Sequence, residues 1–166
     1  MHQRVLTQVF GVVGAVIERD GKFLLVKEHM PKHPDHGKWN QPAGWIDVGE
    51  NPIDAVAREV REETGLTFTP MHILGLYSLV QKNNAGKFGE GSMPHSLKII
   101  FVGEAQEMPG ATFNPKEIDE IHWFTSEEIE AMDGKILRDM DIKKEVRDYL
   151  AGVRYPLELL THTVQE

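Results

Sequence analysis

Cysteine is absent from this chain of 166 residues. Its absence excludes structural disulfides, zinc–thiolate sites and cysteine nucleophiles. Long apolar runs are missing as well. No segment approaches the roughly 18 consecutive apolar residues of a membrane-spanning helix, and the N-terminal MHQRVLTQVF has no basic region that leads into one. We therefore expect a cytoplasmic protein with no membrane partner and no secretory signal.

Basic residues are scarce, with 18 Lys and Arg against 26 Asp and Glu, so the formal net charge is −8. This balance argues against nucleic acid as a partner, because binding to a phosphate backbone rests on Lys and Arg. An anionic small-molecule substrate would need metal ions or locally placed basic side chains. The length fits one domain, residues 1–166, that is large enough for a substantial core.

The most informative segment is residues 44–66, GWIDVGENPIDAVAREVREETGL. Asn51 can cap a helix, and Pro52 suits the first helical position, whose N–H has no partner in any case. No further Gly or Pro occurs before Gly65, a typical helix stop. We predict a helix over 52–64, with an apolar stripe at residues 53, 56, 57 and 60 against the core.

Glu59, Glu62 and Glu63 fall on one face of that helix, within about a third of its circumference. Like charges so close are relieved by solvent or by a cation, and carboxylates are hard ligands suited to Mg²⁺ or Mn²⁺. Arg58, four residues before Glu62, can pair with it. A solvated acidic helix face is the alternative interpretation.

Apolar segments elsewhere predict further elements. The expected strands cover residues 9–17, 22–27, 72–81, 97–104 and 120–124, and the expected helices cover 126–132 and 142–151. Asp20-Gly21 predicts a turn that pairs the first two strands. Residues 30–38 and 83–94 are expected to form loops, and Thr125 with Glu128 to form a capping box. These elements indicate an α/β (α+β) class with a mixed sheet covered by helices.

Residues 44–66 match, without a mismatch, the pattern Gly, five residues, Glu, seven residues, Arg-Glu-apolar-any-Glu-Glu-any-Gly-apolar. The chain therefore resembles the MutT-like Nudix hydrolases. The resemblance implies an α/β/α sandwich with a mixed β-sheet. It also implies Mg²⁺-dependent cleavage of a small-molecule phosphoanhydride by metal-activated water, with Mn²⁺ as a substitute ion and a homodimer as one form.

The resemblance assigns roles to individual residues. Glu59, Glu62 and Glu63 become the metal-binding and catalytic acids, and the backbone carbonyl of Ala43 a further metal ligand. Four residues of the signature would hold the loop–helix–loop in shape: Gly44, Glu50, Arg58 and Gly65. A further acid is expected from the loop before the last strand, where we favour Glu117 over Glu120.

Residues 39–44 and 154–158 resemble the NudJ-type nucleotide phosphatases, which implies nucleoside di- and triphosphates or a thiamine-type pyrophosphate as substrate. Candidate substrate contacts are Arg154, Lys87 and Trp39. Each also has an ordinary interpretation: a helix-end arginine that pairs with Glu158 or a carbonyl, a residue at a hairpin tip, and core packing, respectively.

His29, His33 and His36 lie in or beside the Pro-rich loop 30–38, which shows no Asp–His logic of the kind that orients metal-binding histidines. We interpret them as solvated histidines rather than as a metal cluster. Two other functions fit the sequence less well. A nucleotide-sensing domain usually has a degraded signature and a fused DNA-binding module, and neither is seen here. An isopentenyl-diphosphate isomerase would need a catalytic cysteine.

Overall fold

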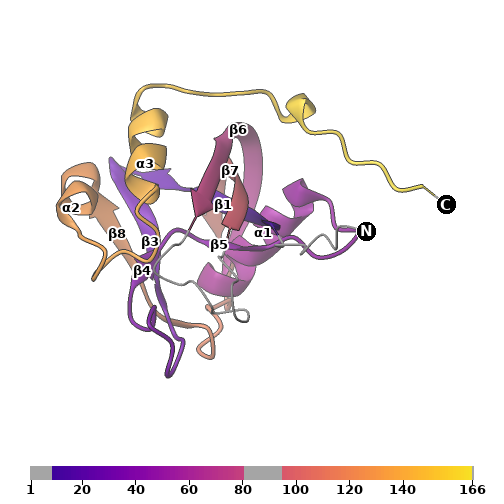
Figure 1. Ribbon diagram of the computed structural model, residues 1–166. Helices are drawn as coiled ribbons and strands as arrows, with labels where there is room; N and C mark the ends of the chain where they lie inside the picture. Colours follow the sequence, from indigo (N-terminus) through magenta and orange to yellow (C-terminus); the bar gives the residue numbers. More distant parts are fainter. Residues whose placement is uncertain (1–8, 81–94, 166) are drawn as a thin grey trace, which may run out of the picture.

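The structure is a computed structural model that describes residues 9–80 and 95–165 (Figure 1). Its strands are β1 Val9–Val16, β2 Glu18–Arg19, β3 Lys22–Glu28, β4 Trp39–Asn40, β5 Ala43–Trp45, β6 Leu66–Val80, β7 His95–Glu107 and β8 Ile118–Thr125. Its helices are α1 Pro52–Thr64, α2 Ser126–Ala131 and α3 Ile142–Leu150, followed by a short 3₁₀ turn, η2, at Leu157–Leu159.

The larger sheet has the strand order β5-β1-β7-β6 and is mixed, as expected. β1 and β7 run parallel, whereas β1 pairs antiparallel with β5 and β7 pairs antiparallel with β6. β6 and β7 extend well beyond the predicted segments 72–81 and 97–104. The predicted loop 83–94, including Lys87, lies outside the described residues.

The smaller sheet is built around β3, which pairs antiparallel with β2, β4 and β8. The predicted pairing of residues 9–17 with 22–27 was wrong in extent. Asp20 and Gly21 do form the turn, with φ values of 52° and 77°, but only the two-residue β2 pairs across it. β1 lies instead inside the larger sheet, where Val13, Ala15 and Val16 are buried. A turn signal predicts the reversal of the chain but not how far the strands stay together.

Helix α1 begins and ends where the sequence predicted. The Asn51 side chain accepts a hydrogen bond from the Ile53 amide at 3.0 Å, and Gly65 closes the helix at φ 74°. Its buried residues include Ala55, Val56 and Val60, which pack against β1 and β6. Ala55 is therefore more buried than Ala57, which the predicted stripe contained.

Two hydrophobic clusters flank the strands. One packs α1 against the larger sheet, and the other packs α2 and α3 against strands of both sheets. Figure 1 accordingly shows α1 and α3 on opposite sides of the strands. The predicted capping box of α2 is present, with Thr125 and Glu128 each bonded to the other's backbone N–H. None of the helices in the described part of the chain has the length and apolar character needed to cross a bilayer.

Candidate active site

A pocket of about 360 Å³ opens beside α1. It is lined by the end of β3, by β5, by α1 and by the loop that precedes β8. In Figure 1 the loop after β3 and the loop before β8 both extend from the lower side of the molecule. The acidic lining of the pocket consists of five glutamates: Glu28, Glu59, Glu62, Glu63 and Glu117.

Helix α1 presents its three predicted glutamates at three depths. Glu63 is buried, at 8% exposure, and its Oε2 accepts a hydrogen bond from the Ala43 amide at 2.9 Å. The Glu59 side chain is 13% exposed, whereas that of Glu62 is 43% exposed. The common face predicted from helical spacing therefore exists, and it runs from the interior to solvent. Ala43 also lines the pocket.

Gly44, the first glycine of the signature, is required because the Glu59 carboxylate packs directly against it. A Cβ added to Gly44 would lie 2.0 Å from Cδ of Glu59 and 2.2–2.3 Å from its carboxylate oxygens. Any side chain at position 44 would therefore displace the Glu59 carboxylate. Gly44 shapes the site by leaving a space in β5 that this carboxylate fills.

Arg58 is the cation that contacts Glu50, Glu59 and Glu62. Its guanidinium forms a bidentate pair with Glu50, at 2.8 and 2.9 Å, and contacts Glu59 at 2.6 Å and Glu62 at 3.3 Å. It also donates to the Trp45 carbonyl at 3.1 Å. The predicted pairing with Glu62 is thus present, but the stronger partner is Glu50. Arg58 ties the loop before α1 to the helix.

The loop before β8 brings Glu117 to the pocket. The Asn114 amide donates to the Glu62 carbonyl at 3.0 Å, which docks this loop on the end of α1, and the His29 amide donates to the Glu117 carbonyl at 2.7 Å. The alternative acid, Glu120, is half exposed and pairs with Lys27 at 3.4 Å. Glu117 lines the pocket and Glu120 does not.

Comparison with known proteins identifies this loop–helix–loop. A family model described as a NUDIX domain matches residues 7–145. The chain belongs to the Nudix family.

Similar proteins agree with this family. The phosphatase NudJ of Escherichia coli K12 is 31% identical over 150 residues, which cover 89% of this chain and 88% of that protein. The solved structure of a Nudix hydrolase from Nitrosomonas europaea is 35% identical, with a TM-score of 0.79 over 94% of this chain and 98% of that one. A MutT protein from Methanosarcina mazei Go1 is 25% identical, with a TM-score of 0.68. The chain is thus a Nudix hydrolase, an enzyme that acts on pyrophosphate bonds, and the predicted Nudix α/β fold is confirmed.

The electrostatics of the Nudix pocket favour a bound cation. Burial raises the pKa of Glu63 well above its usual value, and the neighbouring charge of Glu28 raises it further. Burial also raises the pKa of Glu59, although Arg58 opposes the shift. Carboxylates that resist ionisation where they stand are stabilised by a positive ion. Their oxygens are the hard donors that suit the divalent metals used by Nudix hydrolases.

Glu28 is a pocket residue that the sequence interpretation missed. It is buried, and its Oε1 accepts hydrogen bonds from Arg138 at 2.5 Å and from Asn40 at 3.1 Å. One signal was available: a glutamate ends an apolar strand directly before the loop that leads to the signature. The periodicity of that strand does not say which face meets α1.

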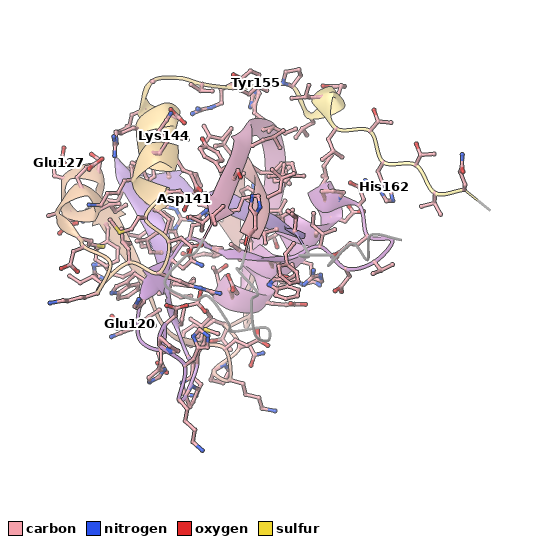
Figure 2. All side chains as sticks on the ribbon, viewed as in Figure 1. Glu120, Glu127, Asp141, Lys144, Tyr155 and His162 are labelled. Carbon is pink, nitrogen blue, oxygen red and sulfur yellow. The ribbon has the colours of Figure 1, made fainter. Side chains whose placement is uncertain are left out.

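Trp39 and Arg154, the two candidate substrate contacts among the described residues, do not line this pocket. Trp39 packs edge-on against Phe124, with ring centroids 4.9 Å apart, which matches its ordinary interpretation. Arg154 donates to the carbonyls of Tyr149 and Val153 and lines a different pocket. Figure 2 shows Tyr155, next to Arg154, at the top of the view and Glu120 near its lower left. Lys87 lies outside the described residues.

The solvated interpretation of the histidines rested on the lack of Asp–His pairs, and this reason was wrong for His29 and His33, since each lies beside an aspartate. Asp119, 90 residues further along the chain, lies 2.7 Å from Nδ1 of His29, and the rings of His29 and His36 are 5.6 Å apart. The pairing of β3 with β8 brings these residues together. His33 instead lies beside Asp35, with 3.6 Å between Nδ1 and Oδ2.

Proposed function

We propose that this Nudix hydrolase cleaves a phosphoanhydride bond in a nucleoside di- or triphosphate, or in another nucleoside diphosphate-linked or thiamine-type pyrophosphate, with Mg²⁺ as its metal and Mn²⁺ as a substitute. The convergence of Glu59, Glu62, Glu63 and Glu117 on one pocket carries the proposal. A homodimer, a cytoplasmic location and a single domain over residues 1–166 stay predictions from the sequence.

The proposed roles follow from the depth of each carboxylate. Glu62 and Glu63 would hold the metal, since the Glu62 side chain reaches solvent and that of Glu63 is fixed by the Ala43 amide. Glu59 lies between them against Gly44 and accepts a proton from the attacking water, while Glu117 approaches from the opposite loop. When bound, Mg²⁺ lowers the pKa of that water and neutralises charge on the phosphate oxygens. Arg58 keeps Glu59 oriented.

An exposed aromatic ring supports a substrate with a planar group. Trp45 lines the pocket, is 51% exposed and stacks at a tilt on Phe10 with ring centroids 4.7 Å apart. A base stacked on such a ring gains about 1–3 kcal/mol without sequence preference. The similarity to phosphatase NudJ supports cleavage of a phosphate compound, and the resemblance of residues 39–44 and 154–158 to nucleotide phosphatases favours a nucleotide.

The test is a substrate panel assayed for phosphate and pyrophosphate release with Mg²⁺, with Mn²⁺ and with a chelator. The panel comprises nucleoside di- and triphosphates, nucleotide sugars, dinucleoside polyphosphates and a thiamine-type pyrophosphate. We expect metal-dependent release from at least one nucleotide or thiamine-type compound. Equal release with the chelator would refute the metal dependence, and turnover of nucleotide sugars or dinucleoside polyphosphates alone would narrow the substrate class to those compounds.

A substitution at Trp45 separates stacking from chemistry. Trp45→Leu should raise KM for a nucleotide substrate by about fivefold or more, which corresponds to the lower end of the stacking energy above. It should leave kcat nearly unchanged, because the ring touches the base and not the reacting phosphorus. A loss confined to kcat would contradict this placement of the substrate.

A further inference from the structure

A second cluster of metal-type donors lies at the edge of the Nudix pocket. One nitrogen of His29, one of His36 and one carboxylate oxygen of Asp119 lie within 4.8 Å of one another. In a tetrahedral site with bonds of about 2.0–2.2 Å, two ligand atoms lie about 3.3–3.6 Å apart. Side-chain rotations that shift the donors by about 1 Å would bring all three to one ion, since His36 and Asp119 are exposed and His29 is half-buried.

Backbone hydrogen bonds hold the loop that carries His36. The Gly37 amide donates to the Glu28 carbonyl and the Glu28 amide to the Lys38 carbonyl, both at 2.9 Å, so the two ends of the loop are paired. Within it, the His36 amide donates to the His33 carbonyl at 3.0 Å. The buried Asp35 then pairs with Lys38 at 3.2 Å. The position of His36 opposite His29 is thus built into the loop.

The hydrogen bonds of the two rings suit ligation. Asp119 lies 2.7 Å from Nδ1 of His29, so a carboxylate oxygen and an imidazole nitrogen already face one another. The Met30 amide donates to Nδ1 of His36 at 3.1 Å, so this nitrogen carries no proton and keeps its lone pair. An ion would replace that amide, a hydrogen bond whose net contribution is about 1 kcal/mol.

The donor chemistry differs from that of the glutamates. Imidazole nitrogens suit Zn²⁺ and other first-row transition metals, whereas Mg²⁺ prefers oxygen ligands. Three protein ligands leave a fourth position of a tetrahedral ion open. We propose that His29, His36 and Asp119 form a second metal site, which binds a transition-metal ion of the Zn²⁺ type separately from the glutamate site.

The site formed by His29, His36 and Asp119 lies beside the Nudix pocket, so an ion bound there would act on the pocket. His29 lines the pocket, and its backbone amide donates to the carbonyl of Glu117. A divalent ion on His29 therefore places positive charge beside five glutamates, with an open ligand position for an anionic oxygen. Binding of the ion itself needs no substrate and no turnover, so it can be measured whether or not the proposed function holds.

The test is calorimetric titration of Zn²⁺ into the full chain with several millimolar Mg²⁺ present to fill the glutamate site. His29→Gln, His36→Gln and Asp119→Asn should each weaken Zn²⁺ binding by at least about tenfold. His162→Gln, at an exposed histidine near the C-terminus, is the matched control and should bind as wild type (Figure 2). Thermal melts identify any variant that fails to fold, and His36, which is exposed, is the least disruptive position.

A second measurement locates the ion. Zn²⁺ should shift the ring nitrogen resonances of His29 and His36 and leave that of His162 in place. Glu62→Gln combined with Glu63→Gln should keep the Zn²⁺ affinity. The proposal is overturned if the histidine variants bind Zn²⁺ as wild type does, or if the glutamate variant loses the site and they do not.

Discussion

Arg58→Met tests whether one guanidinium holds the glutamate cluster together in the absence of metal. The side chain is 24% exposed and makes five contacts of 2.6–3.3 Å, four to carboxylate oxygens of Glu50, Glu59 and Glu62 and one to the Trp45 carbonyl. Methionine fills a similar volume without a charge. The variant therefore leaves three carboxylates close together with no cation.

The expected loss follows from the geometry. A charge-assisted hydrogen bond contributes about 1.5–3 kcal/mol, and the fork with Glu50 supplies two short ones. Solvent screens this partly exposed pair, so we take the lower value, about 1.5 kcal/mol, for each of the two bonds. The unfolding free energy should therefore fall by roughly 3 kcal/mol. For a chain of this size that lowers Tm by about 6–12 °C. Several millimolar Mg²⁺ should reduce the difference, because a bound ion replaces part of the lost charge.

Thermal and urea unfolding of both proteins, with and without Mg²⁺, measure these effects. Arg61→Met is the matched control, since Arg61 is exposed on the same helix, and it should change the unfolding free energy by less than about 0.5 kcal/mol. Arg58 also lowers the pKa of Glu50, so its contribution is present at neutral pH and disappears as pH falls through that lowered pKa. Equal losses in the two arginine variants would refute the reasoning.

Two further predictions concern other carboxylates. Three acids, Glu145 among them, share the buried Lys98 ammonium, and burial raises the pKa of Glu145 to about 7. The folded state therefore holds the proton of the Glu145 carboxyl more tightly than the unfolded chain does. The stabilisation that this proton contributes is fully present below about pH 4 and is lost as pH rises through 7. Glu145→Gln should remove that part of the pH dependence in melts between pH 4 and 8, and an unchanged profile would contradict the assignment. Glu117→Gln should cripple turnover while Glu120→Gln stays near wild type across pH, and the reverse result would exchange the two assignments.

Local signals predicted α1 and its glutamates well. Asn51, Pro52 and Gly65 mark both ends of the helix, and a 3.6-residue period fixes which side chains share a face, whatever the rest of the chain does. The capping box at Thr125 and Glu128 succeeded for the same reason. In each case the interacting residues are within a few positions of one another.

Contacts between distant segments could not be predicted in this way. Which strands pair decides that Glu28 reaches the pocket, that Asp119 meets His29, and that Arg154 lies elsewhere. The alternating pattern of a strand shows which of its residues share a face, but it does not show which strands lie next to it. The resemblance to the Nudix family supplied the link between α1 and Glu117 that spacing alone lacks.

The central claim is that the α1 glutamates hold the metal that hydrolysis needs, and turnover of Glu62→Gln and Glu63→Gln at saturating Mg²⁺ tests it most directly. Each change removes a ligand charge and keeps the shape of the side chain. Glu158→Gln, at an exposed position near the C-terminus, is the control. The account predicts that both helix variants fold as wild type and lose turnover by orders of magnitude, while the control keeps it. Wild-type turnover in both helix variants would contradict the account.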